Sequence, residues 1–264
     1  IPVVVFNQFF TNPFITKYYS LFNFIVCNTI VCSPLIKLLS GFDIPVIWWI
    51  HEAKVSYHSA QLQNMPENVG NNIHIYCGGE YAKKVLLSFC PNYSAETMLY
   101  YVPDYSNELK NIEQYDIQVE EGKIVFACIG MQEERKGQDI LLNAILLLPN
   151  EYREKCFFLF VGKSHYQPIA DKISYIKSLF PNLIHHIPEV LPDQLKTIYD
   201  QIDCLICSSR DDPMPIVVTE AFLMKKIVIC SENSGSSQFI IDGVNGYTYH
   251  NDSYIELSDK IVSY

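Results

Sequence analysis

Short apolar runs of strand length alternate with helix-length segments from one end of the chain to the other. An apolar run of about four to eight residues between polar or turn-forming residues predicts a buried strand. The alternation is typical of parallel α/β architecture, in which a helix connects successive parallel strands. The expected strands cover residues 3–6, 24–28, 45–50, 73–77, 98–102, 123–129, 157–161, 203–207 and 227–230, and the expected helices include 138–148 and 215–224.

A polar stretch that begins at Asp104 and holds few apolar positions interrupts this pattern. It predicts a linker over residues 106–121 between two Rossmann-like domains, an N-terminal one over residues 1–105 and a C-terminal one over residues 122–264. We expect the two domains to face a cleft, with ligands at the carboxyl ends of the strands. The N-terminal domain is expected to be incomplete, because its first strand pattern begins at residue 3 and the chain starts at Ile1 rather than at methionine.

About half of the 264 residues are apolar, which is enough to bury the cores of two moderate domains. The formal net charge of −10 argues against nucleic acid as the main partner, because phosphate backbones bind basic surfaces. Residues 1–105 are nearly neutral, with five lysines, no arginine and six acidic residues. This aromatic-rich half is therefore expected to make any contact with a lipid-linked partner or with the periphery of a membrane.

The nine cysteines are scattered and mostly lie in apolar runs, which indicates reduced core residues in a reducing compartment. Cys204 and Cys207 are three apart in an expected strand, where they face opposite sides of the sheet and do not form a redox or zinc pair. The longest apolar stretch, 21–39, contains Pro34 and is not expected to cross a membrane as one helix. The expected location is the cytoplasm, with the inner face of the membrane as the alternative.

The segment after strand 203–207 carries the strongest chemical signal. Asp212 and Glu220 stand eight positions apart around the start of the expected helix 215–224. A helix N-terminus offers unpaired N–H groups and partial positive charge, and therefore suits an anionic diphosphate. One of the two carboxylates beside it could hold a sugar and the other a ribose. In the alternative interpretation, Asp212 caps the helix with Pro213 as its first residue, and Glu220 is a solvated helix residue.

A second loop, from Gly130 to Gly137, follows strand 123–129 and carries Arg135 and Lys136. Two cations at the carboxyl end of a strand can donate charge-assisted hydrogen bonds to a diphosphate. Gly137 permits a tight turn into the next helix. Taken alone, the two cations are better interpreted as solvated charges on a surface loop. Because both loops are expected at the same edge of one sheet, we expect the cations and the helix N-terminus to meet.

In the first half, His51 follows the apolar strand 45–50. A neutral imidazole at the end of a strand can donate to or accept from a hydroxyl, although a structural hydrogen bond is the alternative. Trp48 and Trp49 are expected in packing. The sequence has no zinc-ligand spacing, no Ser-His-Asp signature and no Walker loop, so neither a metal nor another cofactor is expected.

Three segments together resemble the GT-B glycosyltransferases of family 4. They are the run 130–144, the segment Asp-Pro-Met-Pro-Ile-Val-Val-Thr-Glu at 212–220 and the segment Ile-Asp-Gly-Val-Asn-Gly-Tyr at 241–247, with weaker support from Trp-Trp-Ile-His-Glu at 48–52. The resemblance implies a nucleotide-diphosphate sugar as the donor and transfer without a metal and with retention of configuration. It also implies a glycan, a lipid-linked molecule or another hydroxyl compound as the acceptor, as in polysaccharide biosynthesis.

The resemblance also implies roles for individual residues. The acids match the family's Glu-x7-Glu motif, so that Asp212 would contact the donor sugar and Glu220 the ribose. Arg135 and Lys136 would hold the diphosphate, and His51 would face the sugar from the N-terminal domain. Donor-binding positions implied around them are Gly130, Pro213, Met214, Pro215, Ile216 and Val217.

Two departures from the family pattern bear on these roles. The first acid is aspartate rather than glutamate, which shortens its reach by a methylene group. Met131 stands where the family commonly has arginine, and Arg135 is the cation expected to compensate. Two other functions remain open: a nucleotide-sugar epimerase, for which no convincing acid/base set is visible, and a non-catalytic subunit that binds a sugar nucleotide.

Overall fold

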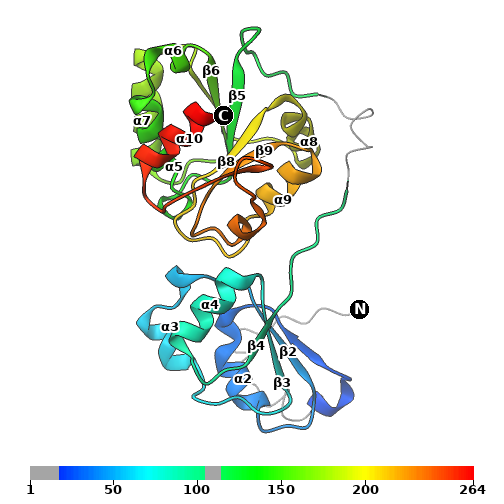
Figure 1. Cartoon of the computed structure of the whole chain (residues 1–264). Helices are drawn as coiled ribbons and strands as arrows, with labels where there is room; N and C mark the ends of the chain where they lie inside the picture. The colour runs from blue at the N-terminus through cyan, green and yellow to red at the C-terminus, as the bar shows by residue number, and fades with distance from the viewer. Residues whose placement is uncertain (1–17, 105–113) are drawn as a thin grey trace. The chain divides into compact units, whose positions relative to one another are not determined.

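The computed structural model describes residues 18–104 and 114–264, and the chain divides into two compact units, Ile1–Leu99 and Tyr100–Tyr264 (Figure 1). Each unit contains a parallel sheet with helices packed on it, which confirms the expected α/β class. The expected strand at 3–6 and residues 106–113 of the expected linker lie outside the described residues. The proposed domain boundaries stay predictions.

The first unit holds a parallel sheet in the order β1-β2-β3-β4. The first, third and fifth residues of β2, Val46, Trp48 and Ile50, are fully buried, whereas the two residues between them are half-buried, as expected for a strand with one face on the core. The elements are β1 Ile25–Cys27, β2 Val46–Ile50, β3 Ile73–Cys77 and β4 Ala95–Thr97, with α2 Ser33–Leu39, α3 Ser59–Asn64, α4 Glu80–Phe89 and the 3₁₀ turns η2 Tyr19–Leu21, η3 Ile30–Cys32 and η4 Lys54–Ser56.

The strand expected at 98–102 is wrong. The fourth strand lies earlier, because its ladder with β3 ends where Cys77 pairs with Thr97. After one further hydrogen bond, from Met98 N to Cys77 O at 2.8 Å, the chain runs past the end of the sheet. The apolar residues beyond it, such as Leu99 and Tyr101, are exposed.

The second unit holds a parallel sheet in the order β10-β9-β8-β5-β6-β7. Its strands are β5 Ile124–Ile129, β6 Cys156–Val161, β7 Ile184–Ile187, β8 Cys204–Cys207, β9 Ile227–Ser231 and β10 Gly246–Tyr249. Its helices are α5 Gln138–Leu147, α6 Asn150–Arg153, α7 Gln167–Leu179, α8 Pro192–Gln201, α9 Ile216–Leu223 and α10 Tyr254–Ser263, with the 3₁₀ turns η6 Glu134–Lys136 and η7 Gly235–Phe239. Strands β7 and β10 fall outside the expected set, because these edge strands bury only their first and last residues and carry no continuous apolar run.

Alternate residues of the central strands pack into two separate cores, one on each face of the sheet. Phe126 and Cys128 of β5 pack on the face covered by α5, α7 and α10, whereas Val125 and Ala127 pack on the face of α8 and α9 (Figure 1). The same alternation puts Cys204 and Cys207 on opposite faces, as expected, and all nine cysteines of the chain are free. In the part of the chain that the structure describes, no helix is long and apolar enough to cross a bilayer.

The order of the second sheet reverses direction between β5 and β8. The chain runs from β5 outward through β6 to β7, and then returns to β8 on the other side of β5. The loops after β5 and β8 therefore start side by side at the carboxyl edge of the sheet and lead to helices on opposite faces of it. In open α/β sheets this switch point is where ligands bind.

Candidate functional site

The loop after β5 is shaped by glycines that permit close backbone contacts. Gly137 has φ 64°, and a Cβ there would lie 2.1 Å from the carbonyl oxygen of Ser208, in the loop after β8. Gly162, with φ 135°, likewise leaves no room for a Cβ, which would lie 2.2 Å from Gly130 O. Positive φ and this crowding both require glycine. The loop after β5 is thus held against the loop after β8 at one end and against the end of β6 at the other.

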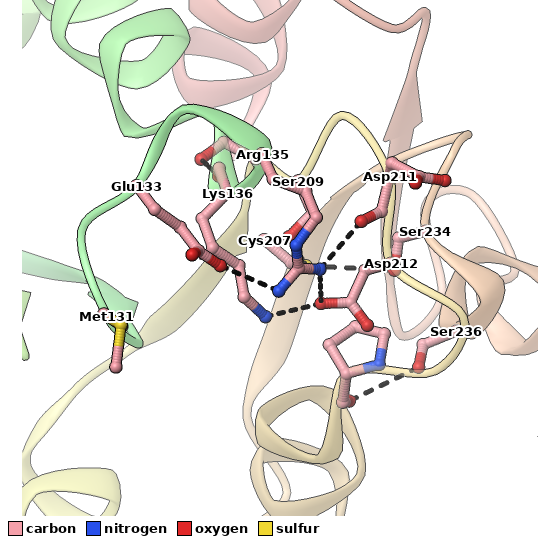
Figure 2. A network of polar contacts seen from close by, with 12 residues as sticks. Met131, Glu133, Arg135, Lys136, Cys207, Ser209, Asp211, Asp212, Ser234 and Ser236 are labelled. Carbon is pink, nitrogen blue, oxygen red and sulfur yellow. Dashed lines mark hydrogen bonds and ion pairs between the residues drawn. The ribbon is translucent and has the colours of Figure 1, made fainter. Parts of the chain in front are cut away.

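Lys136 and Arg135 converge on the carboxylate of Asp212, as Figure 2 shows. Lys136 Nζ lies 2.5 Å from Asp212 Oδ2, and Arg135 Nη1 lies 3.5 Å from the same oxygen. The Asp212 side chain is 7% exposed, so this pairing is largely shielded from water. The cation loop and the acid loop, which lie 76 positions apart in the sequence, therefore meet at the same point.

Arg135 is fixed on three sides. It donates to Asp211 O at 2.8 Å and to Glu133 Oε1 at 2.8 Å, in addition to its contact with Asp212. Met131 is half-exposed and lies away from the Arg135 guanidinium in Figure 2. Arg135 therefore brings its positive charge to the Asp212 loop.

The backbone of Asp212 is also fixed, by the loop after β9. Asp212 N donates to Asn233 O at 3.3 Å, and Gly235 N donates to Asp212 O at 2.8 Å. Ser236 Oγ lies 3.4 Å from Pro215 O, which joins η7 to the start of α9. Val218 N donates to Pro215 O at 3.1 Å, whereas the N–H groups of Ile216 and Val217 have no i−4 acceptor within the helix. The site thus combines a helix N-terminus, two cations and a buried carboxylate.

Glu220 lies in the second turn of α9 and is half-buried. Its Oε2 accepts a hydrogen bond from the hydroxyl of Tyr199, at 2.7 Å, and Tyr199 is fully buried on α8. This contact fixes the carboxylate on the side of the helix that faces α8. Glu220 and Asp212 are held by different partners: Asp212 lies in the loop before α9 and pairs with Lys136, whereas Glu220 lies within α9 and binds Tyr199.

The alternative interpretation of these two acids is wrong. The N-cap of α9 is Pro215 rather than Asp212, and the helix starts at Ile216 rather than near Pro213. Asp212 accepts hydrogen bonds from side chains of the other loop instead of capping the helix. Glu220 is hydrogen-bonded and half-buried rather than solvated.

The sequence analysis did not identify three residues that hold the site in place. Tyr199 holds Glu220, Gln138 donates to Met131 O at 2.9 Å, and Arg210 reaches the backbone of the turn that carries the cations. Their signals are weak in a single sequence, because a tyrosine on a helix or an arginine in a loop is unremarkable until its partner is known. Only the stretch Ser-Ser-Arg-Asp-Asp hints at Arg210, since it lies directly beside the acids.

His51 lies at the end of β2 in the first unit, as expected. Burial lowers the pKa of His51 more than the neighbouring Glu52 raises it, so the imidazole is neutral near pH 7. Its Nε2 is hydrogen-bonded to Asn28 Oδ1, and its ring lies 4.3 Å from that of Trp49. Glu52 accepts from the backbone N–H of Ile30 at 3.0 Å and has a structural role in this loop.

Comparison with known proteins identifies the family. Residues 110–264 match the family described as glycosyl transferases group 1. The chain belongs to this family. A match of 25% identity over 242 residues relates it to spore coat protein SA of Bacillus subtilis (strain 168), covering 85% of the chain and 63% of that protein. This group 1 glycosyltransferase chain thus spans less than two thirds of the length of that relative.

Solved structures share the fold of this group 1 glycosyltransferase at low sequence identity. HepE of Anabaena in complex with UDP superimposes with a TM-score of 0.74 at 14% identity, over 95% of this chain and 70% of HepE. The sucrose-phosphate synthase of Thermosynechococcus elongatus gives a TM-score of 0.70 at 16% identity, over 99% of this chain and 70% of that one. The fold is that of the GT-B glycosyltransferases, as expected.

Among residues 18–104 and 114–264, no three His, Cys, Asp or Glu side chains are grouped as metal ligands. The metal-independent reaction stays a prediction, as do the individual roles of the site residues.

Proposed function

We propose that this chain transfers a sugar from a nucleotide-diphosphate donor to a hydroxyl acceptor, with retention and without a metal, as the family 4 enzymes do. One observation carries the proposal: the cations of the β5 loop, the Asp212 carboxylate and the N-terminus of α9 meet at the switch point of the second sheet. Family membership and the complexes of HepE with UDP and with UDP-glucose support a nucleotide sugar as the donor.

The reaction breaks the bond between the sugar and the diphosphate, so negative charge grows on the leaving phosphate. Lys136 and the N–H groups at the start of α9 would stabilise that charge, with Arg135 adding to the positive field. An ammonium group has three N–H donors, so Lys136 can keep Asp212 while another of its hydrogens binds a phosphate oxygen. Cations and the helix dipole would thus do what a divalent metal does in other transferases.

Asp212 and Glu220 would orient the donor. Asp212, fixed by Lys136, presents its remaining acceptor capacity to sugar hydroxyls, and Glu220, fixed by Tyr199, presents its own to the ribose. Because both carboxylates are held by other side chains, little of their freedom is lost when the donor binds. His51, neutral near pH 7, would contact the donor sugar. The acceptor would be a glycan or a lipid-linked molecule in the cytoplasm or at the inner membrane face.

The first prediction concerns Lys136. Lys136→Ala should lower kcat for transfer from UDP-glucose by about 100- to 1,000-fold, the range measured when a donor to developing charge is removed from an active site. Steady-state kinetics would be measured alongside calorimetric binding of UDP. UDP and UDP-glucose are the probes; GDP-mannose and ADP-glucose would follow in the wild type if neither UDP compound binds.

Lys226→Ala is the matched control, because the Lys226 ammonium donates to Asp200 O, at 2.9 Å, at the amino end of β9. It should leave binding and turnover unchanged. Wild-type levels of both in Lys136→Ala would contradict the assignment of the donor site. Binding of a sugar nucleotide without transfer to any glycan or lipid-linked acceptor would instead favour a non-catalytic subunit.

A further inference from the structure

The turn that carries Arg135 and Lys136 is held from outside by its own backbone carbonyls. Glu134 O accepts from Arg210 Nη1 at 2.7 Å, and Arg135 O accepts from Arg210 N at 2.8 Å. Lys136 O accepts from Ser208 Oγ at 3.0 Å. All three successive carbonyls of η6 are thus bound by residues that directly follow β8. A single 3₁₀ turn has poor hydrogen-bond geometry of its own, so these contacts set its position.

Arg210 is itself rigidly anchored. Its Nη1 and Nη2 each lie 2.7 Å from one oxygen of Asp139, in the first turn of α5, and its Nε lies 2.6 Å from Asp252 Oδ1. A two-point pair of guanidinium and carboxylate fixes direction as well as distance. The Arg210 side chain is 27% exposed, so water weakens this pair only in part. Arg210 therefore ties the β8 loop, the cation turn and the start of α5 into one rigid unit.

The donors of Arg210 are nearly all used by the protein. A guanidinium has five N–H groups, and contacts with Asp139, Asp252 and Glu134 O engage four of them. One N–H of Nη2 is left, so a two-point contact of Arg210 with a phosphate would require breaking the pair with Asp139 or Asp252. The use of most of its donors on the turn and its anchors fits a residue that acts through the turn it holds.

We propose that Arg210 is a positioning residue for sugar transfer, which holds the η6 turn so that Lys136 meets the donor diphosphate. The inference rests on the proposed function of the Lys136–Asp212 site. Displacement of a catalytic group by about 1 Å can lower a rate by about 100-fold. Arg210→Met should therefore lower kcat on UDP-glucose by about 30- to 100-fold, with a smaller change in KM, because the leaving-group charge appears only in the transition state.

The first experiment measures the position of the turn without any ligand. Amide hydrogen exchange of the whole chain, wild type and Arg210→Met, is followed in peptides that cover residues 131–138. We expect about 10-fold faster exchange at Lys136 and Gly137, whose amides donate to Glu133 O and Glu134 O within the turn. Arg153→Met is the matched control, because Arg153 also donates to two backbone carbonyls, Leu146 O and Leu148 O, but at the C-terminal end of α5. Unchanged exchange in Arg210→Met would overturn the proposal.

The second experiment is a double-mutant cycle with Lys136→Ala, read out as kcat for UDP-glucose. If Arg210 acts through Lys136, Arg210→Met should lower kcat by less than about threefold in the Lys136→Ala background, although it lowers kcat by about 30-fold or more in the wild type. A residue that only stabilises the fold would lower activity by the same factor in both backgrounds, and that result would overturn the inference. Where Arg210→Met does not fold, Arg210→Lys replaces it, with an expected loss of about 10-fold because lysine can hold only part of the network.

The two proposals fail separately. Wild-type UDP binding and turnover in Lys136→Ala would refute the donor site, whatever Arg210 does. A large effect of Lys136→Ala, together with wild-type exchange and kcat in Arg210→Met, would leave the donor site intact and refute the positioning role.

Discussion

Two buried glutamines near the cation turn differ in a way that the sequence does not reveal. Gln138 is 2% exposed, and its amide holds the loop: Nε2 donates to Met131 O and Oε1 accepts from Glu133 N. Gln132 is 1% exposed, yet neither atom of its side-chain amide has a hydrogen-bond partner among the described residues. A buried polar group without a partner costs about 1–3 kcal/mol. One glutamine therefore joins two backbone groups of the loop, whereas the other makes no side-chain hydrogen bond with the described residues.

The second prediction follows from this contrast. Gln132→Met, which keeps the length of the side chain and removes the amide, should raise the free energy of unfolding by about 1 kcal/mol. Gln138→Met should lower it by about 1–2 kcal/mol, because it leaves the Met131 carbonyl without its donor. Urea unfolding followed by circular dichroism measures both changes. A change of the same sign in the two variants would contradict the explanation.

At the scale of elements, the ends of the expected strands and the starts of the expected helices predicted where the charged residues of the site lie. The strand and helix expected at 123–129 and 138–148 are confirmed as β5 and α5 with ends that agree to within a residue, because the apolar runs and the flanking glycines are unambiguous. The sequence predicted the position of the loop between them but not its conformation. Its shape depends on Ser208 and Arg210, more than 70 positions away, and on the glycine contact at Gly137.

The anchoring of α5 should respond to acid. Burial alone would raise the pKa of Asp139, but the hydrogen bonds and charge of Arg210 outweigh burial and lower that pKa. A depressed pKa in the folded state contributes stability above the unfolded value of about 3.9, and this contribution is lost as the pH falls through the folded pKa. The pair thus stabilises the wild type at neutral pH and ceases to do so in acid.

The third prediction is that Asp139→Asn is less stable than the wild type at pH 7, by about 1 kcal/mol for a partly exposed pair, and that the gap closes below about pH 4. Urea unfolding from pH 7 to pH 3 measures it. A gap of unchanged size at pH 3 in Asp139→Asn would show that the pair does not act through its charge.

At the scale of the whole molecule, every group of buried apolar residues in the described chain stays within one unit. One cluster lies around Trp48 in the first unit, and two lie on the faces of the second sheet. Ile117, in the last part of the expected linker, packs into the second unit, and Tyr115 N donates to Thr197 Oγ1 at 2.9 Å. The second unit therefore has a complete core of its own and contains all the proposed donor-binding residues.

The fourth prediction is that residues 100–264, expressed alone, unfold cooperatively in urea and bind UDP with an affinity within about threefold of that of the whole chain. Transfer to an acceptor should be lost, because His51 is absent. His51→Ala in the whole chain is the companion variant, and should lower kcat while UDP binding persists. A fragment without cooperative unfolding would show that the first unit is needed for the core of the second.

The sequence by itself determined the α/β class, the strands and helices of the second unit's centre, and the identity of the charged residues at their ends. Periodicity and turn residues are local, and a buried parallel strand is nearly uniform in its apolar character, so one sequence suffices to find it. The spacing of Asp212 and Glu220 paired the two acids, and family resemblance added the role expected of each.

The sequence predicted that the two loops meet, but only the tertiary structure decided which of their side chains are in contact. The order of the strands places the loops after β5 and β8 side by side, so that Lys136 pairs with Asp212 and Arg210 binds the cation turn. Helices α8 and α9 pack on one face of the sheet, which brings Tyr199 to Glu220. The reason is physical: a hydrogen bond or an ion pair depends on distances of a few ångströms between groups that lie far apart along the chain, and no local pattern encodes them. The edge strand β10 and the early end of β4 were decided in the same way, by the partner strand rather than by their own residues.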